Sequence, residues 1–114
     1  MLSPDILRKK ADFDRIYRTG QSVGDRYLVV FRLPNHLPFN RTAFLASKKV
    51  GNSVARNRAR RLMKESFRLL ADQMGTGFDL IIIARVTING RKCADVKRSL
   101  HSALMRIGVI QRGG

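Results

Sequence analysis

The chain has 114 residues, which is enough for one modest core and too few for two, so we expect a single domain over 1–114. Hydrophobic residues make up 44% and charged residues 27%, a balance that excludes a disordered chain. The 23 Lys and Arg against 8 Asp and Glu give a formal net charge of +15. This excess indicates a polyanionic partner, either nucleic acid or an anionic membrane surface.

The first predicted element is a short helix. Phe13, Ile16 and Tyr17 recur at the spacing of one helix face, which predicts a helix over about 11–18. Gly20 follows where a glycine commonly ends a helix. The three acids near this helix, Asp5 among them, are expected to interact with its positively polarised N-terminal end.

Two strands and a long helix are predicted next. Aromatic and β-branched residues predict a strand over Tyr27–Leu33, and a proline-flanked turn leads to a second, antiparallel strand over Thr42–Ser47. Asn52 or Ser53 then caps a helix. That helix is expected to run to about Gln73, before the glycines of a loop.

The last two predicted elements complete one small sheet. Phe78–Arg85 is almost continuously apolar, as expected for a central buried strand. It lies beyond the long helix, so we expect it to be parallel to the strand before that helix. A final helix is predicted over about Ala94–Ile107. The order αββαβα predicts an α/β (α+β) two-layer sandwich with a small mixed sheet.

The long predicted helix separates charge from apolar surface. Residues 48–68 include eight basic residues and one acid, Glu65. At about 100° per residue, one face carries basic side chains and Asn57, and the other is apolar. Arg58 stands on a separate flank. The basic face consists of Arg56, Asn57, Arg60, Arg61, Lys64 and Arg68, and the apolar face includes Ala55, Ala59, Leu62, Met63, Phe67, Leu69 and Leu70.

This basic face is interpreted as a binding surface. A solvated helix face is the ordinary explanation for a charge run, but here the charges have one sign and repel at i, i+4. Arginine predominates, and its planar fork matches phosphate oxygens bidentately. An anionic membrane is disfavoured because the apolar face lacks an aromatic border. We therefore expect a nucleic acid.

The stretch Ser47–Arg68 resembles the signature of the bacterial ribonuclease P protein subunit. It has Lys-Lys, a short loop with Asn, Arg-Asn-Arg, two further basic residues and another base three positions on. Phe13, Tyr17, the Ser22–Leu33 region and Phe78–Arg85 resemble family positions as well. The resemblance therefore spans nearly the whole chain.

The resemblance implies an accessory protein of a ribozyme. In the family a large RNA with bound Mg²⁺ is the catalyst, and the protein binds that RNA and the 5′ leader of precursor tRNA. The leader is removed endonucleolytically to give the mature tRNA 5′ end. The resemblance also implies a left-handed crossover between the parallel strands. It implies no tightly bound cofactor in the protein, and no DNA or membrane partner.

The family's functional positions carry over to two groups of residues. The positions that match its RNA-facing motif are Lys48, Lys49, Asn52, Arg56, Asn57, Arg58, Arg60, Arg61 and Lys64, and the basic face adds Arg68. The leader of the family lies in a cleft between the first helix and the sheet. The matching positions are Phe13, Tyr17 and Phe31. Val29 and Tyr27 are expected on the same strand face as Phe31.

Aromatic side chains in such a cleft can stack unpaired bases, although burial in the core is the alternative for each of them. Tyr17, with its polar tip, favours the cleft most. One position departs from the family pattern. Relatives often carry a further basic residue after the base that ends the third predicted strand, and here Val86 follows Arg85. This puts part of the leader contact in doubt.

Two other functions are weighed against a ribozyme cofactor. A structural RNA-binding protein of the ribosome-assembly type would need the basic helix but no exposed aromatic residues. A metal-dependent nuclease would need clustered carboxylates, and the acids here are isolated in sequence. We expect no catalytic residue and no metal site in the protein. The single cysteine, Cys93, excludes an internal disulfide and fits a reducing cytoplasm.

Overall fold

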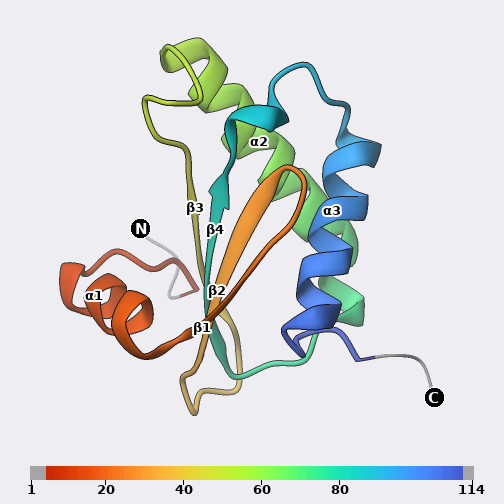
Figure 1. The fold of residues 1–114 in the computed structure, drawn as a ribbon. Helices are drawn as coiled ribbons and strands as arrows, with labels where there is room; N and C mark the ends of the chain where they lie inside the picture. Colours follow the sequence, from red (N-terminus) through yellow and green to blue (C-terminus); the bar gives the residue numbers. More distant parts are fainter. Residues whose placement is uncertain (1–4, 112–114) are drawn as a thin grey trace.

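The computed structural model describes residues 5–111, which fold into three helices and a four-stranded sheet (Figure 1). The predicted helices and strands are all present, with ends shifted by at most three residues. Two short 3-10 helices follow α2 and β4. In chain order the helices and strands are α1 (Lys10–Thr19), β1 (Gln21–Gly24), β2 (Leu28–Pro34), β3 (Arg41–Leu45), α2 (Ser53–Leu70), β4 (Phe78–Ala84) and α3 (Cys93–Arg106).

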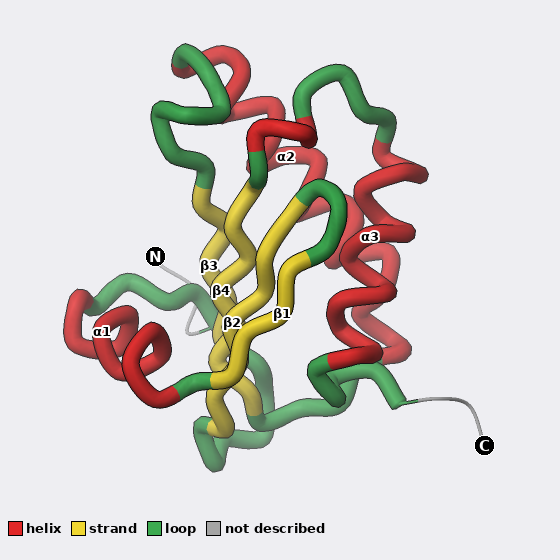
Figure 2. Tube along the Cα trace, in the orientation of Figure 1, coloured by secondary structure: helices red, strands yellow, loops and turns green. Residues whose placement is uncertain are grey.

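The sheet has the strand order β1-β2-β4-β3 (Figure 2). β3 and β4 are parallel, as predicted, and α2 connects them. β2 and β3 run in opposite directions, also as predicted, but they do not pair because β4 lies between them. The central place of β4 follows from its apolar sequence, since a central strand is covered on both faces. The left-handed sense of the crossover stays a prediction.

Helices lie on both sides of the sheet (Figure 1). α2 and α3 cover one face, where Leu80 and Ile82 of β4 belong to the larger core cluster. α1 covers part of the other face, where Ile81 packs with Ile16 in a smaller cluster. The fold thus adds a partial third layer to the two predicted. Consecutive apolar residues in β4 require it, because side chains alternate between the two faces of a strand.

Local sequence accounts for the ends of the two helices that matter most. The Asn52 side chain accepts a hydrogen bond from the Ala55 amide at 2.9 Å and thereby caps α2. Gly20 ends α1 where the chain passes close to β2. A β-carbon at Gly20 would lie 2.5 Å from the Ile16 oxygen and 2.7 Å from the Arg32 oxygen. Only glycine fits there without a shift of backbone.

The strand β1 is missing from the sequence-based prediction. Its four residues, Gln21–Gly24, are mostly exposed and polar, so they carry no apolar alternation. Backbone pairing with β2 makes them a strand. We expected Tyr27 on the strand face that carries Phe31, but Tyr27 lies in the turn between β1 and β2. Tyr27 precedes β2 and packs with the α2–α3 core, where the Arg91 guanidinium lies over its ring.

Candidate nucleic-acid interface

The exposed face of α2 forms a basic surface beside a shallow hollow. Asn57, Arg60, Arg61 and Lys64 line this hollow of about 470 Å³ together with Val54. The opposite face of α2 buries Ala59, Met63, Ser66 and Leu70. Leu69, predicted as apolar core, is instead 41% exposed. Its neighbour Leu70 is buried, so the apolar face of α2 narrows at its last turn and Leu69 lies outside it.

Most charges on the basic surface have no counter-charge. Within residues 5–111, the four side chains Arg56, Arg60, Arg61 and Lys64 make no ion pair. The Asn57 side-chain oxygen accepts a hydrogen bond from Arg60, which orients that guanidinium. Such a concentration of unpaired cations on one helix face attracts anions.

Arg68 differs from the other basic residues of α2. Its guanidinium makes two hydrogen bonds to Glu65, at 2.6 and 3.0 Å. The hydrogen bonds from Arg68 lower the pKa of Glu65, and the Glu65 carboxylate raises that of Arg68. The Arg68–Glu65 pair therefore adds less net positive charge to the basic surface than each unpaired basic residue does.

The remaining predicted RNA-facing residues lie around this surface rather than in its centre. Lys48 and Lys49 are exposed in the turn before α2. The Asn52 oxygen is used by the helix cap. Arg58 points toward α3, where its guanidinium donates to the Arg91 carbonyl oxygen at 2.7 Å. That contact braces the start of α3 against α2 and accounts for the separate flank expected for Arg58.

The aromatic residues predicted to line a cleft meet on the opposite face of the sheet. The Tyr17 ring meets the Phe31 ring edge-on, with centroids 5.0 Å apart, and the Phe13 ring lies 6.4 Å from that of Tyr17. Phe13 and Phe31 are half-buried against the smaller core cluster. Tyr17 is 43% exposed, and partial burial raises the pKa of its phenol. Tyr17 is therefore the most accessible of the three.

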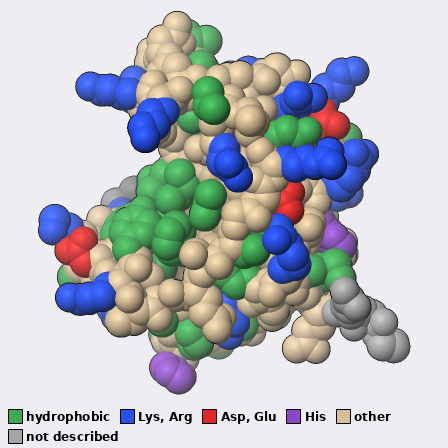
Figure 3. All heavy atoms as spheres, viewed as in Figure 1, with side chains coloured by type: hydrophobic (Ala, Val, Ile, Leu, Met, Phe, Trp, Pro, Cys, Tyr) green, Lys and Arg blue, Asp and Glu red, His purple; other side chains and the backbone are tan. Residues whose placement is uncertain are grey.

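An apolar floor extends from these rings across the sheet. Val29 of β2 stands opposite Ile83 of β4, and Leu45 of β3 pairs with Ile83 on its other side. All three are half-buried, because α1 covers only the far end of this face. Figure 3 shows the resulting apolar patch beside α1, with Lys and Arg side chains on the lobe above it.

A second hollow joins the aromatic side of α1 to the basic side of α2. It measures about 460 Å³ and lies at the edge of β3, where the segment before α1 pairs with Thr42. Phe13 lines it from α1, Leu45 from β3 and Lys64 from α2. The two groups of residues predicted from the sequence are therefore neighbours around one edge of the sheet, although they occupy opposite faces.

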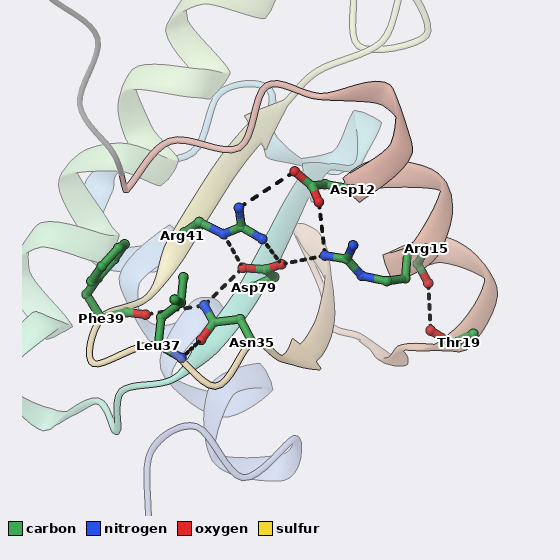
Figure 4. A network of polar contacts seen from close by, with 8 residues as sticks. All are labelled: Asp12, Arg15, Thr19, Asn35, Leu37, Phe39, Arg41 and Asp79. Carbon is green, nitrogen blue, oxygen red and sulfur yellow. Dashed lines mark hydrogen bonds and ion pairs between the residues drawn. The ribbon is translucent and has the colours of Figure 1, made fainter.

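The structure also contains a buried ionic network that sequence reasoning missed. Asp79 of β4 is completely buried, and both of its oxygens accept hydrogen bonds from Arg41, at 2.7 and 2.8 Å (Figure 4). Arg15 reaches Asp79 at 3.3 Å and Asp12 at 3.0 Å, and Arg41 lies 3.6 Å from the second oxygen of Asp12. These four residues form an ion-pair ring of alternating charge. Asn35 adds a hydrogen bond of 3.0 Å to Asp79.

Burial by itself would raise the pKa of Asp79, but the hydrogen bonds from Arg41 and Asn35, with the charges of Arg41 and Arg15, outweigh it and lower the pKa. The Asp79 carboxylate is thus a stable anion in the fold. A signal for it exists in the sequence, since an acid inside the apolar run Phe78–Ala84 needs cationic partners. The sequence alone does not say which arginines they are.

The described residues contain no group of three or more His, Cys, Asp or Glu side chains arranged to hold a metal ion. The carboxylates that approach each other, Asp12 and Asp79, are both engaged by arginine. No described helix combines the length and apolar character needed to cross a membrane.

The fold and this surface together define a small basic α+β protein of the RNA-binding class. A family model described as "Ribonuclease P" matches residues 1–108. A "Ribonuclease P protein component" from Clostridium botulinum (strain Langeland) is 42% identical over 104 residues, covering 90% of this chain and 94% of the relative. The corresponding component of Thermoanaerobacter sp. (strain X514) is 41% identical over 100 residues, covering 88% and 86%.

Solved structures agree with these relatives. The RNase P protein of Staphylococcus aureus superposes with a TM-score of 0.85 and 32% identity, over 96% of this chain and all of that chain. The protein from Thermotoga maritima gives a TM-score of 0.81 with 28% identity, over 89% and 96%. The chain belongs to the ribonuclease P protein family. It is the protein subunit of this RNA-processing endoribonuclease, as predicted from the sequence, and this role implies an RNA partner.

Proposed function

We propose that the basic surface of α2 binds the catalytic RNA of ribonuclease P, while the apolar cleft beside α1 binds the 5′ leader of precursor tRNA. The single observation that carries this proposal is the separation of two unlike surfaces. One is rich in unpaired cations, and the other exposes an aromatic ring over a half-buried apolar floor.

The basic surface suits a folded RNA. Arg60, Arg61 and Lys64 present guanidinium and ammonium donors from successive turns of one rigid helix, so they can contact phosphates spaced along a backbone. Arg56 stands one turn earlier on the same face, and Lys48 and Lys49 extend the positive charge before the helix. A solvent-exposed helix with no partner would keep these repelling charges without compensation.

The cleft suits an unpaired strand. Tyr17 and Phe31 offer ring surfaces on which bases stack, at about 1–3 kcal/mol per base, and Val29 with its neighbours supplies an apolar floor. A leader that precedes the tRNA fold is such a strand. Contact with it favours the precursor over the mature product, because only the precursor has a leader.

In this proposal the RNA subunit supplies the Mg²⁺ ions and the bond-breaking chemistry, and the protein supplies binding surfaces. The protein's carboxylates support this division of labour, because Asp12, Asp25 and Asp79 are each engaged by arginine. We propose the cytoplasm as the compartment, for which the free thiol of Cys93 is suited.

The test compares precursor and mature tRNA in the reconstituted holoenzyme. Tyr17→Ala and Phe31→Ala should weaken precursor binding by about 5-fold to 150-fold, the loss of one stacked base, and leave mature tRNA binding unchanged. Tyr17→Phe is the matched control, because it keeps the ring and removes only the hydroxyl. An equal loss for both tRNAs would reject the cleft as the leader site.

A further inference from the structure

We propose that the ion-pair ring of Asp12, Arg15, Arg41 and Asp79 fixes the rotation of α1 about its own axis, and so positions Phe13 and Tyr17 for the leader. Arg15 and Asp12 are positioning residues in this proposal and do not touch the leader themselves. The inference rests on the leader cleft proposed above and adds a device that sets its geometry.

The first step is the weak attachment of α1. Ile16 is the only residue of this ten-residue helix that is buried, whereas α2 buries four residues and α3 five. Phe13 is only half-buried and Tyr17 is exposed, so one fully buried side chain anchors α1. Apolar contacts of this kind leave the rotation of the helix weakly fixed, because apolar contact is not directional. Other contacts must select one orientation.

The second step is the arrangement of side chains around that pivot. At about 100° per residue, Asp12 and Arg15 lie about 40° and 100° to one side of Ile16. Phe13 and Tyr17 lie about 60° and 100° to the other side. The ring and the aromatic residues are therefore on opposite flanks, so rotation about Ile16 that opens one flank closes the other.

The third step is the directional character of the ring. Arg41 holds both oxygens of the buried Asp79 and fixes that carboxylate in the sheet. Arg15 then binds Asp79 from α1 while Asp12 binds Arg41, so two contacts of opposite sign join the helix to the sheet (Figure 4). Two such directional contacts determine an orientation, which the apolar contacts of α1 alone do not.

The fourth step links this orientation to the cleft. The Tyr17 and Phe31 rings meet at an interplanar angle of 88°, an edge-on contact that depends on how α1 is turned. Base stacking needs an aromatic ring in a defined place, so a site on a helix whose rotation is not fixed binds bases more weakly. The ion-pair ring thus determines how well the cleft discriminates precursor from mature tRNA.

The decisive variants remove opposite charges from the ring. Arg15→Met removes a positive charge and Asp12→Asn a negative one, while Arg41 stays paired with Asp79 in both. Each should lower the ratio of precursor to mature tRNA affinity in the reconstituted holoenzyme by roughly threefold to tenfold, which lies within the range for residues of one ionic network. If the two side chains acted only through general attraction to RNA, the affinity ratio would fall in Arg15→Met and rise in Asp12→Asn. That result would overturn the proposal.

Three further measurements separate positioning from mere folding. Arg18→Met is the matched control, because Arg18 is exposed on the same helix and its loss should change the ratio by less than about twofold. The double variant Asp12→Asn/Arg15→Met should lose less than the product of the single losses, since either change already breaks the ring. Proton NMR of the Asp12→Asn and Arg15→Met variants should show a weakened contact between the aromatic rings of Tyr17 and Phe31, while Ile16 stays packed in the core.

The outcomes also distinguish this inference from the proposed function. If Tyr17→Ala lowers the affinity ratio but neither ring variant does, the ring is only structural and the cleft stands. If Tyr17→Ala leaves the ratio unchanged, the cleft and the inference built on it both fail. Asp12→Asn nearly preserves side-chain shape, so it decides the question should Arg15→Met not fold.

Discussion

The helices α1 and α2 are both amphipathic and both rich in charge, yet they differ in how that charge is paired. In α1, Lys10 binds Asp14 at 3.0 Å and Arg15 binds Asp12 at the same distance. In α2, only Arg68 has an acidic partner within the described chain. Unpaired charge, rather than charge as such, therefore distinguishes the surface that we propose for RNA. Paired charge in α1 serves the fold.

The largest effect should follow from breaking the paired side of this comparison. Asp79→Ala would break a pair whose carboxylate is completely buried and leave Arg41 with only the more distant Asp12 as an acidic partner. We therefore expect a loss of about 3–5 kcal/mol in the free energy of unfolding. Arg61→Ala on α2 should change stability by no more than about 0.5 kcal/mol. Urea unfolding of both variants checks this. Similar losses for the two would contradict the distinction drawn between the helices.

The unpaired side should matter for RNA binding instead. In a variant with Arg60, Arg61 and Lys64 all changed to Gln, binding to the catalytic RNA should weaken. The slope of the logarithm of the binding constant against the logarithm of salt concentration should become shallower by about 2–3, because three fewer counterions are released. Arg68→Gln should lower the slope less than Lys64→Gln does, since Glu65 already neutralises Arg68. Dissociation constants over a salt series measure both, and an unchanged slope in the triple variant would refute the assignment.

Stability should also depend on pH through the paired acids. Burial raises the pKa of Asp25 and Asp79, but hydrogen bonds outweigh it and both pKa values lie below normal. Their stabilisation is therefore complete above the ordinary Asp pKa of about 3.9 and is lost as pH falls below it.

Asp79→Asn should flatten the acid limb of the stability curve, as measured by urea unfolding between about pH 2 and pH 6. Glu65→Gln is the comparison on α2. The pKa of Glu65 is also lowered, by Arg68, but solvent screens this exposed pair. The stability curve of Glu65→Gln should therefore differ less from that of the wild type. A steeper acid limb in Asp79→Asn than in the wild type would contradict the sign of the shift.

The smallest effect concerns two exposed valines, one just beyond the strand that carries Ile83 of the cleft floor and one beside the basic hollow. Val86, 58% exposed, follows β4, and Val54, 71% exposed, lies beside the basic hollow. Val86→Lys should raise the ratio of precursor to mature tRNA affinity by about twofold to fivefold, the worth of one exposed charge contact. Val54→Lys should leave that ratio unchanged. Equal ratios in the two variants would show that Val86 lies outside the reach of the leader.

The sequence predicted those features that depend on local pattern. The period of apolar residues located α2 within three residues, and Asn52 was identified as one of two candidate caps. The family resemblance gave the cleft residues, and the structure brings Tyr17, Phe13 and Phe31 together. Whether these residues bind RNA stays a prediction.

The features that escaped prediction depend on contacts between distant segments. β1 is a strand only because β2 pairs with it, and its own residues show no alternation. The position of α1 on the second sheet face depends on Ile81, which could not be assigned to a face from a continuous apolar run. The partners of Asp79 come from α1 and β3, 64 and 38 residues away in sequence. No spacing rule joins them.

The central claim is that the protein provides binding surfaces while its RNA partner cuts. The most direct measurement incubates precursor tRNA at low Mg²⁺ with the protein alone, with a bacterial ribonuclease P RNA alone, and with both together. We predict that the leader is removed efficiently only when both are present. Removal of the leader by the protein alone, in a preparation free of RNA, would contradict the account.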